Sequence, residues 1–253
     1  MNLEGSSHLT GTSPRNVELH HFPDEQQLCE AAAERWIQSL PTSDAAAYAL
    51  ALSGGRIAGR LLRSIASLSR NQRNLLDRVH FFWADERCVP PAHAESNFGV
   101  ANRELLLPLD VRPHQIHRIR GEIDDRRAAS EAEQDMRRIV PTRQDGQPVL
   151  DMVFLGMGED GHVASLFPEE PEEPVGSRTI YRSVVATKPP PVRITLTYGT
   201  IVRAKQVWIV ASGPNKMRAL KESLTLDGKT PLARVLQRRR HSVIYTDIPV
   251  PDA

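Results

Sequence analysis

The sequence is poor in cysteine, nearly neutral overall and without a long apolar run. Its 253 residues include two cysteines, Cys29 and Cys88, which excludes a disulfide framework or a cysteine-rich metal site. The formal net charge of +1 argues against a surface built for nucleic acid or membrane. We find no run of 18 apolar residues and no signal-like segment, so a cytoplasmic location is expected.

Several well-known catalytic motifs are missing as well. The sequence has no Gly-x-Ser-x-Gly elbow, no P-loop and no complete Gly-x-Gly-x-x-Gly pattern. The nine histidines are scattered and never show the His-x-x-x-His spacing of a helical zinc site. A serine hydrolase, a nucleotide-binding enzyme and a metalloenzyme are therefore disfavoured, and we expect neither a metal nor an organic cofactor.

The apolar pattern that is present predicts an α/β fold. Short apolar runs occupy residues 47–52, 79–83, 152–155, 193–197, 207–210 and 243–245. Helical patterns cover residues 24–39, 57–68, 96–107 and 124–139, and Gly213-Pro214 opens another helix. This alternation predicts a mainly parallel, Rossmann-like sheet with helices on both faces. We expect a flexible arm at 1–16, one domain at 17–248 and a short tail at 249–253.

Gly-rich or charged segments follow several of these predicted strands. In such sheets ligands bind beyond the carboxyl ends of the strands, so these segments predict a cleft. Gly54 and Gly55 could expose backbone N–H groups to a phosphate at the start of a helix, and Arg56 could add a charged contact. Asp85 and Arg87 could hold sugar hydroxyls or an anion, although an ion pair that shapes the loop would look the same.

The most informative segment is the glycine-rich loop at residues 155–168, with the sequence LGMGEDGHVASLFP. It places Asp160 two residues before His162. A neutral histidine can remove a proton from water, and a neighbouring carboxylate can orient the imidazole. Two further basic residues are candidates for anion binding. Arg193 opens a strand after a proline run, and Lys216 lies where a helix begins, although either could be a solvated surface charge.

These segments together resemble the 6-phosphogluconolactonase family. The matching pieces are LSGG at 52–55, WADERCVP at 83–90, ESNF at 95–98, the 155–168 loop, RITLTY at 193–198 and GPNK ending at Lys216. The resemblance implies metal-independent hydrolysis of 6-phosphoglucono-1,5-lactone in the oxidative pentose phosphate pathway. It implies the fold of glucosamine-6-phosphate deaminases and ribose-5-phosphate isomerases, and a monomer or small homo-oligomer. His162 would be the general base, Asp160 its neighbour, and Arg87, Arg193 and Lys216 the ligands of the phosphate or sugar-acid oxygens.

One departure from the family pattern concerns the first loop. The family usually continues Gly-Gly-Ser-Thr-Pro, whereas this chain continues Gly55-Arg56-Ile57-Ala58. We interpret Arg56 as replacing the missing hydroxyls with a charge. The alternatives are a glucosamine-6-phosphate deaminase-like enzyme and a non-catalytic sugar-phosphate-binding homologue. The deaminases typically carry Asp-Glu-Tyr where this chain has Asp85-Glu86-Arg87, which favours the lactonase.

Overall fold

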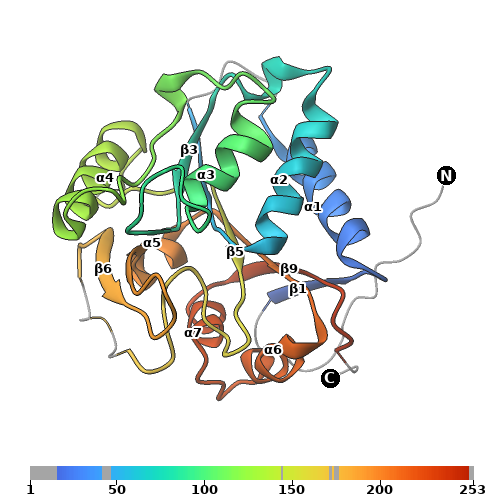
Figure 1. The fold of residues 1–253 in the computed structure, drawn as a ribbon. Coiled ribbons are helices and arrows are strands. Elements are labelled where there is room, and N and C mark those ends of the chain that lie inside the picture. Colours follow the sequence, from blue (N-terminus) through green and yellow to red (C-terminus); the bar gives the residue numbers. More distant parts are fainter. Residues whose placement is uncertain (1–15, 42–46, 144, 171–172, 174–176, 251–253) are drawn as a thin grey trace.

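The computed structural model describes residues 16–41, 47–143, 145–170, 173 and 177–250, over which strands and helices alternate (Figure 1). The strands are β1 (Asn16–His21), β2 (Tyr48–Leu52), β3 (Val79–Trp83), β4 (Asp85–Arg87), β5 (Met152–Gly156), β6 (Tyr181–Val185), β7 (Val192–Leu196), β8 (Gln206–Ala211) and β9 (His241–Thr246). The α-helices are α1 (Glu25–Ser39), α2 (Arg56–Ser69), α3 (Asn97–Ala101), α4 (Asp125–Ile139), α5 (Tyr198–Arg203), α6 (Met217–Leu224) and α7 (Pro231–Gln237). None of the described helices is long and apolar enough to span a membrane.

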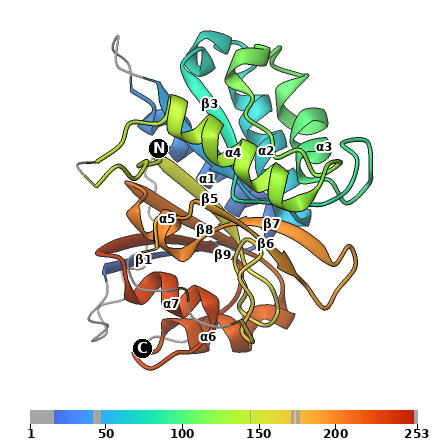
Figure 2. The same cartoon turned by 90° about the vertical axis from the view of Figure 1, so that its left-hand side faces the viewer.

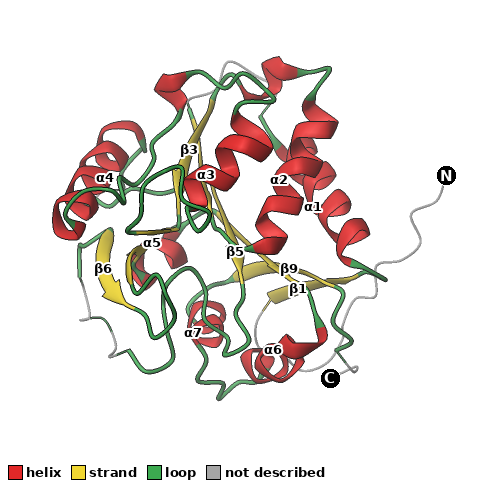
Figure 3. Cartoon of the chain, viewed as in Figure 1, coloured by secondary structure: helices red, strands yellow, loops and turns green. Residues whose placement is uncertain are grey.

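Six strands form one parallel sheet in the order β1-β9-β8-β5-β2-β3. Its inner strands come from the apolar runs of the sequence, and β2 is buried at every residue. Such runs are typical of strands covered on both faces. In Figure 2, α6 and α7 lie on one side of this sheet and α1 and α2 on the other, and Figure 3 shows the strands between the two helical layers. The predicted α/β architecture is confirmed.

A second, antiparallel sheet has the order β4-β7-β6 and corrects two expectations. The predicted strand near Arg193 exists as β7, but it belongs to this small sheet. The charged residues 85–87, which we expected in a loop, form β4, which pairs with β7 from Asp85↔Thr195 to Arg87↔Arg193. The backbone N–H of Ala84 still donates to Leu52 O at 2.7 Å, so the chain changes sheets only one residue after β3 ends.

The order of the main sheet creates a switch point between β2 and β5. From β2 the chain continues outward to β3, whereas from β5 it continues to β8 and β9 on the other side. Ligands of open α/β sheets bind where the strand order reverses, beyond the carboxyl ends. Gly54 and Gly55 follow β2, and the loop carrying His162 follows β5. The fold therefore brings the two glycine-rich segments of the sequence to the same place.

The ends of the chain are tested only in part. Residues 1–15 of the expected arm and residues 251–253 of the expected tail lie outside the described residues. Residue 16, which we expected in the arm, is the first residue of β1. This strand pairs in parallel with β9 from Asn16↔His241 to His21↔Thr246. This edge strand was not predicted from the sequence. The division into an arm, one domain and a tail stays a prediction.

Candidate active site

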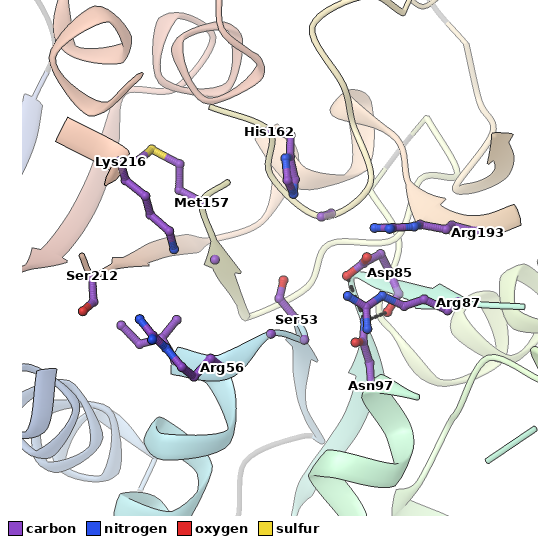
Figure 4. Close-up of a pocket in the computed structure, with 15 residues that line it drawn as sticks. Ser53, Arg56, Asp85, Arg87, Asn97, Met157, His162, Arg193, Ser212 and Lys216 are labelled. Atoms are coloured by element: carbon purple, nitrogen blue, oxygen red, sulfur yellow. Dashed lines mark hydrogen bonds between the residues drawn. The ribbon is translucent and has the colours of Figure 1, made fainter. Parts of the chain in front are cut away.

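A pocket lies at the switch point and collects eight of the nine predicted site residues (Figure 4). These eight are Gly54, Gly55, Arg56, Asp85, Arg87, His162, Arg193 and Lys216. The ninth, Asp160, is absent from the pocket wall but is hydrogen-bonded to His162. Residues that follow β2, β5 and β8 thus meet residues of β4 and β7 in one pocket. The sequence predicted a cleft at these strand ends.

His162 points into the pocket between Lys216 and Arg193 in Figure 4. Its Nδ1 lies 2.5 Å from Asp160 Oδ1, and its backbone N–H donates to the same oxygen at 3.1 Å. The described residues provide no hydrogen-bond partner for Nε2. The side chain is 26% exposed, so solvent reaches the ring. The imidazole is therefore fixed on one edge and open to the pocket on the other.

The state of Asp160 decides which ring nitrogen can act as a base. Burial alone would raise the pKa of Asp160. The charge of His162 and the hydrogen bonds from its backbone and ring lower this pKa by more, so the net pKa is below the ordinary value. The carboxylate is then ionised near neutral pH and can only accept hydrogen bonds. Nδ1 must carry the proton in this pair, which leaves the Nε2 lone pair free to take a proton from water.

The backbone of the His162 loop passes directly under the imidazole at Gly158. A Cβ placed on Gly158 would lie 2.1 Å from both Cε1 and Nδ1 of His162. The N–H of Gly158 donates to the carbonyl of His162 at 2.9 Å, which closes the loop. A side chain at position 158 would therefore displace the ring. The glycine-rich character of this segment is explained by this close approach.

The cations occupy two ends of the pocket (Figure 4). At one end, burial lowers the pKa of Lys216, and the nearby Arg56 lowers it further. At the other end, burial lowers the pKa of Arg193, and the nearby Arg87 adds to the shift. Like charges held together in partly buried positions are unfavourable unless an anion neutralises them. Both ends of the pocket are therefore suited to an anionic or strongly polar ligand group.

Asp85 lines the pocket, but most of its side chain is buried. It is 4% exposed, and its carboxylate accepts hydrogen bonds from Ser165 Oγ at 2.8 Å and Asn97 Nδ2 at 3.2 Å. Asn97 Nδ2 also donates to the carbonyl of Asp85 at 2.8 Å. A Cβ on Gly54 would lie 1.7 Å from Asn97 Oδ1, so the amide fits only against a glycine. The motif at 95–98 suggested the family, but it did not reveal this contact.

The comparisons with known proteins agree with this geometry. The family model described as glucosamine-6-phosphate isomerases/6-phosphogluconolactonase matches residues 23–245. The chain belongs to this family. A 6-phosphogluconolactonase of Treponema pallidum is 39% identical over 206 residues, covering 81% of this chain and 83% of the relative. The resemblance found in the sequence and the expected class of enzyme are thereby confirmed.

Two solved structures of the family show the same fold. The structure of 6-phosphogluconolactonase from Trypanosoma brucei has a TM-score of 0.79 and 25% identity, covering 93% of this chain and 97% of that one. A monomeric glucosamine-6-phosphate deaminase has a TM-score of 0.72 and 19% identity, covering 91% and 97%. The deaminase supports only the fold, which is the superfamily type expected from the sequence.

Glu86 was not singled out from the sequence. In the structure its carboxylate holds the backbone of residues next to the pocket. Its buried carboxylate accepts the backbone N–H of Arg87 at 2.8 Å, of Asn97 at 2.8 Å and of Phe98 at 2.7 Å. Burial raises the pKa of Glu86, although these N–H groups oppose the shift. The carboxylate therefore joins β4 to the start of α3 and so places Arg87 and Asn97.

Glu86→Gln should destabilise the fold by about 1–3 kcal/mol, because the amide NH₂ cannot accept hydrogen bonds and leaves buried N–H groups unpaired. Urea unfolding would measure the loss. Glu34→Gln, at an exposed carboxylate on α1, is the control and should leave the free energy of unfolding nearly unchanged. Equal effects at both positions would contradict the role given to Glu86.

Proposed function

We propose that the chain hydrolyses 6-phosphoglucono-1,5-lactone to 6-phosphogluconate with His162 as the general base. One observation carries the proposal. The imidazole is held by Asp160 through Nδ1, so Nε2 faces a pocket that has cations at both ends. A lactone with a phosphate at its far end needs both features, a base near the ester and a positive site near the phosphate. The pathway and the cytoplasmic location stay predictions.

The phosphate is assigned to the end formed by Gly55, Arg56 and Lys216. Helix α2 begins there, and no side chain caps its first N–H groups. The N-terminus of a helix attracts anions through its unpaired N–H groups and its dipole. A phosphate in this position would also neutralise Lys216, whose charged form is disfavoured first by burial and then by the nearby Arg56.

The ester is assigned to the opposite end, near Arg193 and Arg87. Arg193 is 7% exposed, and its guanidinium lies over the ring of Phe167, with Cζ 5.6 Å from the ring centroid. The His162 ring lies against the same phenyl ring, with centroids 5.1 Å apart. The cation and the base contact the same ring and line the same pocket, which supports the assignment of Arg193 to the developing oxyanion.

The reaction then proceeds in two steps. Nε2 of His162 takes a proton from water while the water oxygen bonds to C1, which moves the carbonyl electron pair onto the oxygen. Arg193 and Arg87 stabilise this oxyanion. When the carbonyl re-forms, the bond between C1 and the ring oxygen breaks, and the imidazolium returns its proton to that oxygen. The product is the open-chain acid, which ionises at neutral pH and again pairs with the arginines.

The proposal is tested by initial rates on three compounds, measured against the spontaneous reaction. We expect 6-phosphoglucono-1,5-lactone to be hydrolysed well above its background rate. Glucono-1,5-lactone, which lacks the phosphate, should be a much poorer substrate because it leaves the Lys216 end empty. Glucosamine 6-phosphate tests the deaminase alternative and should release no ammonia. Phosphorylated lactone that disappears only at the background rate would contradict the proposal and favour a non-catalytic binding protein.

Arg56 should contribute to phosphate affinity. Its side chain lines the pocket but is 80% exposed, and Nη2 lies 3.5 Å from Glu25 Oε2. Because solvent screens an exposed charge, Arg56→Ala should raise KM by only about fivefold, with kcat unchanged. The control is Arg63→Ala on the same helix, which pairs with Glu104 outside the pocket. Steady-state kinetics that show no change in KM for Arg56→Ala would contradict the view that this charge replaces the family's hydroxyls.

A further inference from the structure

Phe167 lies just behind the pocket and touches both groups that the proposed reaction uses at C1. Its ring is tilted by 48° against the His162 ring, with the centroids 5.1 Å apart. The Arg193 guanidinium lies over the same ring at 5.6 Å. His162 belongs to the loop after β5 and Arg193 to β7 of the other sheet. One phenyl ring thus joins the base of one sheet to the cation of the other.

The chain between His162 and Phe167 forms a tight hook, residues 163–167, that brings the phenyl ring back to the imidazole. Val163 and Leu166 form an antiparallel bridge, and Leu166 N donates to Val163 O at 3.0 Å. Ala164 has φ +50°, in the left-handed region that residues other than glycine rarely adopt. Such backbone is retained where surrounding contacts hold it in place, often at functional sites.

Those contacts come from the second sheet. Ser165 is fully buried, and its backbone N–H donates to Thr195 Oγ1 of β7 at 3.2 Å. Its hydroxyl donates to Asp85 Oδ2 of β4 at 2.8 Å. The hook is therefore fixed to the two strands that carry Arg87 and Arg193. Phe167 projects from a segment that is fixed at its centre, so its ring has a defined position relative to both sheets.

One ring hydrogen bond leaves the tilt of the His162 imidazole to be set by packing, whereas Arg193 is held through two nitrogens of its guanidinium. Asp160 holds His162 through one ring nitrogen. Arg193 is held through Nε, which donates to Pro190 O at 3.1 Å, and through Nη2, which donates to Lys188 O at 3.3 Å. The acceptors Asp160, Pro190 and Lys188 are not among the residues that line the pocket. The Phe167 ring, which is tilted against the imidazole and lies under the guanidinium, packs against both side chains and adds a further constraint on their orientation.

We propose that Phe167 is a positioning residue that fixes the imidazole of His162 and the guanidinium of Arg193 relative to each other. This inference rests on the proposed lactone hydrolysis and assigns to the phenyl ring no contact with substrate. Water must meet C1 beside Nε2 while the oxyanion forms beside Arg193, so the two groups must keep one mutual geometry. A displacement of about 1 Å in such a site can cost roughly 100-fold in rate.

The kinetic test compares Phe167→Leu with Phe167→Tyr. Leucine keeps an apolar side chain but removes the flat face, so kcat should fall by roughly 10- to 100-fold. Because the phosphate end is untouched, KM should change little. Tyrosine keeps the ring and should restore most of kcat. Phe22→Leu is the matched control, because it removes another partly buried ring that stacks on Tyr245, 6.1 Å away, outside the pocket.

A second readout does not depend on turnover. The ring current of Phe167 should shift the imidazole C–H resonances of His162, which are identified by their loss in His162→Gln. Phe167→Leu should move these resonances, and Phe22→Leu should not. If Phe167→Leu fails to fold, Phe167→Met, which also lacks a ring, takes its place.

Wild-type kcat in Phe167→Leu, or unmoved His162 resonances, would overturn the role of Phe167. Loss of kcat that Phe167→Tyr does not restore would also contradict it, because the ring itself would then not be what matters. If the wild-type protein lacked lactonase activity altogether, the proposed function would fail. In that case the resonances would still show whether the phenyl ring lies against the imidazole in solution.

Discussion

Replacing His162 with glutamine should lower kcat for the phosphorylated lactone by roughly 10²–10⁴-fold and leave KM close to its wild-type value. Glutamine keeps a polar side chain of similar size, but its amide cannot take a proton from water. The phosphate site proposed at Lys216 does not involve the imidazole, which is why KM should be preserved. A continuous assay of lactone disappearance, corrected for the spontaneous reaction, measures the effect.

His241→Gln serves as the control for that variant, because His241 is 56% exposed and lies at the start of β9, away from the pocket. It should behave as wild type. Protonation of Asp160 would remove the acceptor that holds Nδ1, and the lowered pKa of Asp160 moves this loss to more acidic pH than an ordinary aspartate would show. A His162→Gln variant with wild-type kcat would exclude the imidazole as base.

Arg193→Leu should lower kcat by roughly 10²–10³-fold, the usual cost of removing one group that stabilises an oxyanion. Leucine retains apolar contact with Phe167 but removes the charge. The effect should be similar for the phosphorylated and the unphosphorylated lactone, because the ester is common to both. Arg103→Leu, at a side chain that is 67% exposed and outside the pocket, should change neither kcat nor KM.

The same comparison tests the assignment of the two pocket ends. If Arg193 bound the phosphate instead, Arg193→Leu would impair the phosphorylated lactone and leave the unphosphorylated lactone unaffected. Lys216→Met should show that pattern, since Lys216 belongs to the phosphate end. Exchange of the two patterns would mean that the substrate lies in the pocket in the opposite direction.

The main sheet could be predicted because its inner strands carry an unambiguous physical signal. Runs such as residues 48–52 are apolar at every position, as burial on both faces requires. The edge strand β1 and the strands β4 and β6 of the small sheet were missed because their residues do not share this pattern. Among residues 17–21 of strand β1 only Leu19 is buried, and in β6 the buried residues Tyr181 and Val184 are separated by two partly exposed ones. Strand β4 is charged throughout, and only its pairing with β7 makes it a strand.

Eight of the residues that line the pocket could be predicted, whereas the contacts that hold them could not. Gly54, His162 and Lys216 lie just after a strand or at the start of a helix. The local sequence therefore indicates that they lie at the edge of the sheet where ligands bind. Nothing in the sequence distinguishes Glu86 from its charged neighbours Asp85 and Arg87, but its carboxylate is buried and accepts three backbone N–H groups. Phe167 is one apolar residue of the 155–168 segment, and only the fold brings it against Arg193, 26 residues further along the chain. Such contacts form only in the tertiary structure, so a local sequence pattern does not predict them.

The central claim is that Nε2 of His162 stands beside the reacting carbon while the phosphate lies at the start of α2. A crystal structure of the protein with bound 6-phosphogluconate tests this most directly. We predict the carboxylate of the acid between His162 and Arg193, and the phosphate between the Gly55 N-terminus of α2 and Lys216. A carboxylate out of reach of the imidazole, or a phosphate beside Arg193 instead, would contradict the account.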